Sequence, residues 1–306
     1  MQRITCYPLY GANSALPPLT SVQSRLLDAL FQSGGRYLGD EDSMVRAAAA
    51  PAPGGPSLPA QWSGVGSTRS FPWIELAVMG RSNAGKSTLL NALLSSKPHA
   101  AHSLKSFVPV SRTPGTTVRL EFYGVGSAEK PSLVLVDTPG YGFSIRGKGR
   151  HGVWMERMAE YLRTRRTMSS GPAASPLLAR VMVLADARLG LTELDHGVLQ
   201  ALDDSRLPCH VVLTKADLVG TPSLTATVQA TARALRGYKM PFPHLNVVSG
   251  VTGEGMRELC SAMMHTSKLH RLSAADFEQH SKELSESAAR LAAAGPTPTP
   301  ADRPTQ

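Results

Sequence analysis

The chain has 306 residues, a formal net charge of +9 and three cysteines. Cys6, Cys209 and Cys260 follow no disulfide or metal-binding spacing, so we expect a reducing compartment. No apolar run reaches the roughly 18 to 20 residues that span a bilayer. These features favour a soluble protein without a membrane partner over a secreted disulfide scaffold or a membrane protein.

The first 70 residues do not have the composition of a globular domain. Residues 1–27 contain Arg3 and Arg25, several Ser and Thr, and no Asp or Glu, which is typical of an organelle transit peptide. Residues 47–60, "AAAAPAPGGPSLPA", are too rich in Ala, Pro and Gly to pack. We therefore expect a disordered extension over residues 1–70. Two alternatives are an extension without any address and a partner-binding helix in residues 15–31, "ALPPLTSVQSRLLDALF".

A phosphate-binding loop is predicted directly after the first long apolar stretch. Residues 74–79, "IELAVM", predict a buried strand, and residues 80–87, "GRSNAGKS", precede the helix-forming "TLLNALL". Two glycines let the backbone adopt positive φ angles, so that consecutive N–H groups can face one anion beside the helix N-terminus. The spacing G-x-x-x-x-G-K-[ST] is that of the P-loop, in which Lys86 would reach the β- and γ-phosphates and Ser87 would face Mg²⁺.

Two later segments have the features of γ-phosphate sensors. In residues 111–117, "SRTPGTT", a Pro-Gly turn places Thr117 where it could offer an oxygen to Mg²⁺, although an ordinary hairpin entry is the alternative. In residues 132–142, "SLVLVDTPGYG", an apolar strand ends at Asp137, which can hold a Mg²⁺-bound water. Three residues on, Gly140 offers a backbone N–H to a γ-phosphate. Residues 118–123 and 132–136 would form an antiparallel hairpin.

A further apolar strand predicts recognition of the base. Residues 210–219, "HVVLTKADLV", place Thr214, Lys215 and Asp217 at the strand end. The Asp217 carboxylate can accept hydrogen bonds from N1 and N2 of guanine, which adenine cannot donate, while the Lys215 stem covers the ring. Asp217 as a simple helix cap is the alternative. Residues 245–255, "LNVVSGVTGEG", add a last strand, after which the backbone of Ser249 and Gly250 could meet guanine O6.

The positive charge is concentrated in one segment. Residues 97–166 hold twelve Lys and Arg against five Asp and Glu. Such a surface attracts a polyanion such as RNA through counterion release, although a solvated basic face would have the same composition. Within it, residues 144–152, "SIRGKGRHG", combine glycines with basic residues and would suit a segment that becomes ordered on RNA.

Five stretches resemble, in order, the diagnostic motifs of the EngB family of translation-factor-related GTPases. They are "GRSNAGKSTLLNALL", "SRTPGTT", "VDTPGYGFS", "DARLGLTELDHGVLQ" and "LTKADL", and the resemblance spans residues 71–272. The chain departs from the usual pattern at Thr138, where the family often has Leu, and at Thr116, where a basic residue is common. The long N-terminal extension suggests a eukaryotic organellar member.

The resemblance implies a Mg²⁺-dependent GTPase that assists assembly of the large ribosomal subunit, with GTP or GDP as ligand. The implied partners are the large-subunit precursor and its rRNA. The motifs assign nucleotide binding to Gly80, Arg81, Ser82, Asn83, Ala84, Gly85, Lys86, Ser87, Thr88, Thr214, Lys215, Asp217, Ser249 and Gly250. They assign Mg²⁺ to Ser87, Thr117 and Asp137. They assign catalysis to Lys86, Thr117 and Gly140.

Hydrolysis is expected to be slow in the protein alone. Ras-like enzymes orient the attacking water with a glutamine just after Asp-x-x-Gly, whereas this chain has Tyr141. In related GTPases an asparagine at the position of Asn83 helps to coordinate K⁺, which adds positive charge at the β–γ bridge. We hypothesise that K⁺ acts in this way here.

The predicted fold is α/β: a Ras-like P-loop GTPase domain over residues 71–272, with a mostly parallel six-stranded sheet, one antiparallel hairpin and helices on both faces. Residues 273–306 would form a C-terminal helix and a disordered tail. We expect a monomer in the mitochondrial matrix, with plastid or cytoplasm as alternatives. Two other functions stay open: a switch in signalling or trafficking, and a non-hydrolysing RNA-binding module.

Overall fold

The structure is a computed structural model that describes residues 4–10, 16–32, 34–40, 74–95, 108, 119–126, 131–141, 158–162 and 177–266, with residues 282, 286 and 289. Its strands are β1 (Cys6–Pro8), β2 (Gly35–Asp40), β3 (Ile74–Gly80), β4 (Glu121–Gly126), β5 (Pro131–Asp137), β6 (Leu177–Asp186), β7 (Cys209–Thr214) and β8 (His244–Val247). Its helices are α1 (Ser21–Gln32), α3 (Lys86–Leu94), α5 (Glu193–Asp204), the short η5 (Ala216–Leu218), α6 (Thr221–Leu235) and α7 (Met256–Thr266).

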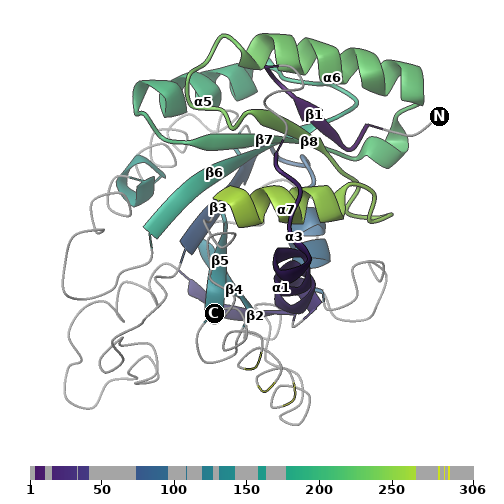
Figure 1. The fold of residues 1–306 in the computed structure, drawn as a ribbon. Helices are drawn as coiled ribbons and strands as arrows, with labels where there is room; N and C mark the ends of the chain where they lie inside the picture. The colour runs from purple at the N-terminus through teal and green to yellow at the C-terminus, as the bar shows by residue number, and fades with distance from the viewer. Residues whose placement is uncertain are drawn as a thin grey trace.

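Within these residues the strands form one eight-stranded mixed sheet in the order β1-β8-β7-β6-β3-β5-β4-β2 (Figure 1). The five central strands β8, β7, β6, β3 and β5 are parallel, and β4 pairs antiparallel with β5. Parallel strands connected by helices place their carboxyl ends at one edge of the sheet, which is where ligands bind in open α/β folds. The parallel strands and the antiparallel β4–β5 hairpin confirm the predicted α/β fold, but the sheet has eight strands rather than the predicted six.

The prediction of a disordered extension is wrong for three segments of residues 1–70, and this error explains why the sheet has eight strands. β1 adds to one edge by antiparallel pairing with β8, and β2 adds to the other edge by antiparallel pairing with β4. α1 is a helix that packs on the chain's own core through the buried Leu26, Leu27 and Leu30. The linker at residues 47–60 and most of residues 273–306 lie outside the described residues.

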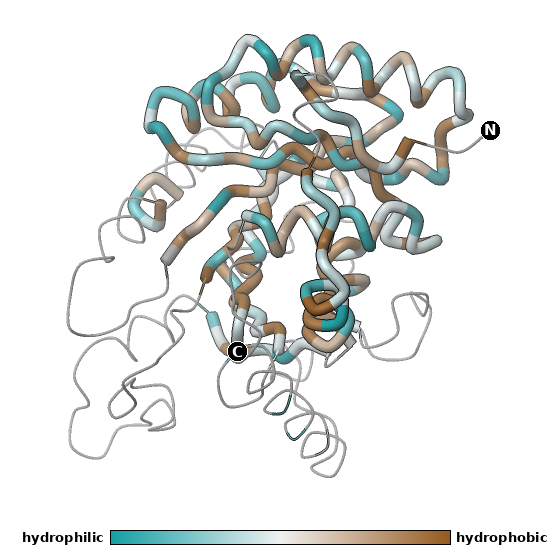
Figure 2. The backbone as a smooth tube through the Cα atoms, viewed as in Figure 1, coloured by the Kyte–Doolittle hydropathy of each residue, from teal (hydrophilic) through white to brown (hydrophobic). Residues whose placement is uncertain are grey.

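Helices cover both faces of the sheet because alternate strand residues point to opposite sides. On β3, Ala77 and Met79 join the core beneath α5 and α6, whereas Leu76 and Val78 join the core beneath α1, α3 and α7. Figure 2 shows hydrophobic residues along the central strands, while α5 and α6 mix hydrophobic and hydrophilic positions. Among the described helices, none has the length and apolarity needed to cross a membrane.

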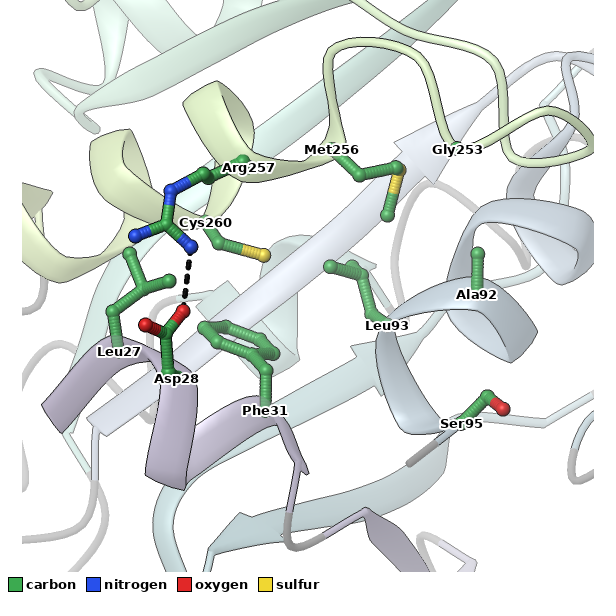
Figure 3. A pocket seen from close by; sticks show the side chains of 10 residues that line it. All are labelled: Leu27, Asp28, Phe31, Ala92, Leu93, Ser95, Gly253, Met256, Arg257 and Cys260. Carbon is green, nitrogen blue, oxygen red and sulfur yellow. Dashed lines mark hydrogen bonds and ion pairs between the residues drawn. The ribbon is translucent and has the colours of Figure 1, made fainter. Parts of the chain in front are cut away.

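α1 is attached to the helices that follow the predicted nucleotide-binding loops. The Arg257 guanidinium of α7 donates hydrogen bonds to Asp28 and, at 2.6 Å, to the Ser24 hydroxyl of α1. A pocket of about 250 Å³ lies between α1, α3 and α7, and Figure 3 shows that Phe31, Leu93 and Cys260 line it. The N-terminal helix is therefore part of the packed domain.

Replacing Leu30 with Ala should lower the free energy of unfolding by roughly 2 to 5 kcal/mol, because it leaves a cavity under α1. Leu30 is 1% exposed. Chemical denaturation measures the change, and the 61% exposed Leu189 supplies the control, since Leu189→Ala should shift stability little. Equal effects of the two substitutions would show that α1 does not pack as described.

Candidate guanine nucleotide site

The loop between β3 and α3 has the conformation that its two glycines and one asparagine allow. Asn83 and Gly85 adopt positive φ angles of 65° and 88°, a region that glycine and asparagine enter most readily. The Ala84 N–H donates to the Arg81 carbonyl at 3.0 Å. Gly80 passes so close to β6 that a Cβ there would lie 3.0 Å from the Leu184 carbonyl oxygen. The loop therefore wraps over the N-terminus of α3, where backbone N–H groups favour an anion.

Lys86 is held inside this loop. Its side chain is buried and its ammonium donates to the Gly80 carbonyl oxygen at 3.2 Å. Burial lowers the pKa of Lys86, and the negative charge of Asp137 opposes that shift. The arrangement places one cation at the loop and one carboxylate facing it.

The segment from Asp137 to Gly140 leaves β5 beside the P-loop. The Thr138 hydroxyl donates to the Val78 carbonyl oxygen at 2.9 Å, which ties the end of β5 to β3. A Cβ on Gly140 would lie 3.0 Å from both the Lys86 ammonium and the Ser82 nitrogen. A side chain at this position would be crowded by Lys86 and Ser82, so the two predicted phosphate-contacting segments are adjacent.

The strand end that was predicted to read guanine is joined directly to the P-loop. The Thr214 hydroxyl donates to the carbonyl oxygens of Ala84 at 2.6 Å and Ala185 at 3.2 Å. Lys215 has a left-handed backbone with φ 58°, and its ammonium donates to the Asn83 carbonyl oxygen. These contacts hold the strand end that is predicted to read the base against the P-loop.

A further carboxylate, Asp186 at the end of β6, holds two cations. Lys215 Nζ lies 3.0 Å from Asp186 Oδ2, and Arg188 forms two side-chain hydrogen bonds with Asp186 at 3.0 and 2.6 Å. Burial acts to raise the pKa of Asp186, but the hydrogen bonds from Arg188 and Lys215 outweigh it and lower the pKa to about 2. Asp186 was not among the predicted site residues, although its place after an apolar strand at the same sheet edge was a usable signal.

The last predicted loop completes the site. The Ser249 hydroxyl oxygen accepts from the Val251 and Thr252 N–H groups at 3.3 and 3.0 Å. A Cβ on Gly250 would lie 3.2 Å from the Thr88 carbonyl oxygen at the start of α3. The Ala216 N–H donates to the Val248 carbonyl oxygen at 3.1 Å, which joins this loop to the one after β7.

The structure thus brings together the loops that follow β3, β5, β7 and β8. Thr117 and residues 142–150 lie outside the described residues, so the predicted roles of these residues stay predictions. Among the residues that the structure describes, no group of three His, Cys, Asp or Glu could hold a metal ion. Mg²⁺ at a phosphate site is usually held by only one or two protein ligands and keeps several waters. Ser87 and Asp137 fit this role, because both lie at the loop that would hold the phosphates.

Comparisons with known proteins agree with this geometry. A family model described as "50S ribosome-binding GTPase" matches residues 75–215. The "Probable GTP-binding protein EngB" of Nitrobacter winogradskyi is 39% identical over 201 residues, which cover 65% of this chain and 82% of the relative. The protein of the same name from Chelativorans sp. is 35% identical over 196 residues, covering 62% of this chain and 79% of the relative.

The chain belongs to the EngB family of GTP-binding proteins. EngB membership implies binding of GTP or GDP with Mg²⁺, and GTP hydrolysis. Two solved structures are also similar. A tyrosine-to-alanine variant of Aquifex aeolicus Era, bound to GDP and AlF₄⁻, has a TM-score of 0.44 and 18% identity, and the match covers 64% of this chain and 57% of that one. A probable GTP-binding protein engB has a TM-score of 0.43 and 16% identity, and the match covers 64% of this chain and 99% of that one. Assignment to the EngB family rests on the sequence relatives.

Replacing Thr214 with Val should weaken this EngB site, because the isosteric side chain leaves the Ala84 and Ala185 carbonyl oxygens without the hydroxyl donor. We expect the free energy of unfolding to fall by roughly 1 to 3 kcal/mol, and GDP affinity, measured with a fluorescent GDP, to fall as well. The control is Thr225→Val on α6, whose hydroxyl donates only locally to the Thr221 carbonyl oxygen at 2.9 Å. Indistinguishable GDP affinities in the two variants would contradict the claim that the Thr214 hydroxyl holds the P-loop in its nucleotide-binding conformation.

Proposed function

We propose that this EngB protein is a GTP-hydrolysing switch in assembly of the large ribosomal subunit in mitochondria. The observation that supports the nucleotide-binding part is the joint of Thr214 and Lys215 with the P-loop, because these two residues directly precede the Ala216-Asp217 turn that we propose reads the base. The ribosomal part is supported by the description of the matching family as ribosome-binding and by the basic composition of residues 97–166.

Each predicted site residue takes a role in this proposal. The backbone from Gly80 to Thr88 binds the phosphates, and Lys86 neutralises charge on them. Ser87, Thr117 and Asp137 hold Mg²⁺, which would supply positive charge to the phosphate oxygens when bound. Gly140 senses the γ-phosphate. Recognition of the base falls to Thr214, Lys215, Asp217, Ser249 and Gly250.

Slow intrinsic hydrolysis is part of the proposal. Tyr141 occupies the position after Gly140, and its phenol donates to Asp195 at 2.7 Å within the core. A phenol committed to that carboxylate does not orient a water at the phosphates. We therefore propose that K⁺ or the ribosomal partner supplies the missing catalytic contribution, with the K⁺ held through Asn83.

The mitochondrial location rests on the absence of acidic residues in residues 1–27. Some of these residues also form β1 and the first half of α1. Removal of the whole segment would uncover the sheet edge at β8, so we propose that an address in this segment is retained after import. The protein is proposed to act as a monomer on rRNA, through basic residues such as those at 146–150.

The tagged protein should migrate with large-subunit precursors on a density gradient of mitochondrial lysate when a non-hydrolysable GTP analogue is present, and at the top of the gradient with GDP. The reason is that a switch presents its partner-binding segments only when a γ-phosphate orders them. Migration at the top in both nucleotide states would overturn the ribosomal proposal and favour a signalling role, while leaving the nucleotide site intact.

GTP turnover should be faster in K⁺ than in Na⁺ at equal ionic strength, because K⁺ held at Asn83 would add positive charge where the leaving phosphate gains negative charge. Phosphate release with large-subunit precursors present is the measurement, and Asn83→Ala should remove the difference. Equal rates of the unmodified protein in the two salts would rule out this use of K⁺.

A further inference from the structure

A buried hydrogen-bonded cluster joins three segments of the nucleotide site. Tyr141, 4% exposed, donates its hydroxyl to Asp195 Oδ1 at 2.7 Å, and Asp195 is 0% exposed. Asp195 Oδ2 accepts from the Thr192 N–H at 2.8 Å and from the Thr192 hydroxyl at 2.6 Å. The Arg81 Nε of the P-loop lies 3.7 Å from the same Oδ2. One carboxylate on α5 therefore faces both the P-loop and the segment after Gly140.

The backbone of Tyr141 is held from a second direction. The Ser82 N–H donates to the Tyr141 carbonyl oxygen at 3.3 Å, and Arg81 forms an isolated parallel bridge with Tyr141. Gly140, the residue before, lies so close to the Lys86 ammonium and to Ser82 that a Cβ would be only 3.0 Å from each. Tyr141 therefore holds Gly140 in position from both its side chain and its backbone.

We propose that Asp195 is a positioning residue for the nucleotide switch: by accepting the Tyr141 hydroxyl and facing Arg81, it holds Gly140 against Lys86 in the arrangement that receives a γ-phosphate. This inference rests on the proposed GTP-binding function and adds the element that sets the position of the γ-phosphate sensor. Asp195 reaches the phosphate-binding segments through Arg81 and Tyr141, so its effect on the nucleotide passes through these two residues.

The hydrogen bonds of Asp195 determine which nucleotide should lose affinity when the cluster is disrupted. A buried carboxylate is stable only when donors satisfy it, so Asp195 favours the conformation in which the Tyr141 hydroxyl reaches it. Burial raises the pKa of Tyr141, so the phenol stays protonated and keeps donating. In the proposed switch Gly140 contacts the γ-phosphate, which GDP lacks, so only the triphosphate form requires Gly140 beside Lys86. Losing the Tyr141 hydroxyl should therefore weaken GTP binding more than GDP binding.

Tyr141→Phe tests the inference, because it keeps the ring and removes only the hydroxyl. Binding of a fluorescent, non-hydrolysable GTP analogue and of fluorescent GDP would be measured in the full chain. We expect affinity for the GTP analogue to fall about tenfold, the value of one hydrogen bond to a charged group, while GDP affinity changes less than about twofold. A residue with a purely structural role would change both affinities together.

The chain offers a matched control in Tyr161→Phe. Tyr161 is 6% exposed and donates its hydroxyl to the fully buried Glu75 at 3.0 Å, so it has the same phenol–carboxylate chemistry. Glu75 lies near the start of β3, five residues before Gly80, at the end of the strand away from the P-loop. Tyr161→Phe should change stability to a similar degree and leave the ratio of the two affinities unchanged.

Asp195→Asn provides an independent test. It removes the negative charge that lies beside Arg81, and it places an amide N–H₂ group among groups that are themselves hydrogen-bond donors. It should lower affinity for the GTP analogue at least as much as Tyr141→Phe does. A ratio of affinities that stays at the unmodified value in both variants would overturn the inference. If the unmodified protein binds neither nucleotide, the proposed function fails instead, so the two failures are distinguishable.

Discussion

The nucleotide site depends on one joint, in which Thr214 and Lys215 bind the carbonyl oxygens of the P-loop. A single hydroxyl, that of Thr214, ties the end of β7 to both the loop after β3 and the end of β6. Lys215 adds a contact to Asn83, one of the two loop residues with a positive φ angle. Because these contacts use carbonyl oxygens, they occupy none of the loop's N–H groups, which are the groups that bind an anion at such a loop.

Each buried charge in the site lies next to an opposite charge, and this pairing makes its burial energetically tolerable. The buried Lys86 lies near the buried Asp137, and the buried Asp186 is paired with Lys215 and with the exposed Arg188. An isolated buried charge would be strongly unfavourable, whereas paired and hydrogen-bonded charges are tolerated. The buried Asp195 is satisfied in the same way: it accepts hydrogen bonds from Thr192, which precedes α5, and from Tyr141, and it lies 3.7 Å from Arg81 of the P-loop. Paired charges thus hold together the elements that surround the candidate nucleotide site.

The local motifs were predictable because their geometry is set within a few residues. The glycine spacing of the P-loop, the apolar strand before Asp137 and the Thr-Lys-Ala-Asp turn each define a conformation locally, and the hairpin of β4 and β5 follows from adjacent strands. The edge strands were not predictable in this way. β1 has only three residues, and it pairs with β8 more than 230 residues later, so no alternating pattern identifies it. The roles of Asp186, at the end of β6, and Asp195, in α5, likewise depend on contacts between segments that are far apart in the sequence.

The most direct measurement of the central claim, that this site reads guanine through Asp217, is nucleotide binding by Asp217→Asn. An asparagine amide can donate to the O2 atom of xanthine but cannot accept both guanine donors, so preference should move from GDP to xanthosine diphosphate. We predict that the unmodified protein prefers GDP over the adenine and xanthine diphosphates, and that the variant loses roughly a hundredfold or more in GDP affinity. Unchanged GDP affinity in the variant, or equal binding of ADP and GDP by the unmodified protein, would contradict the account.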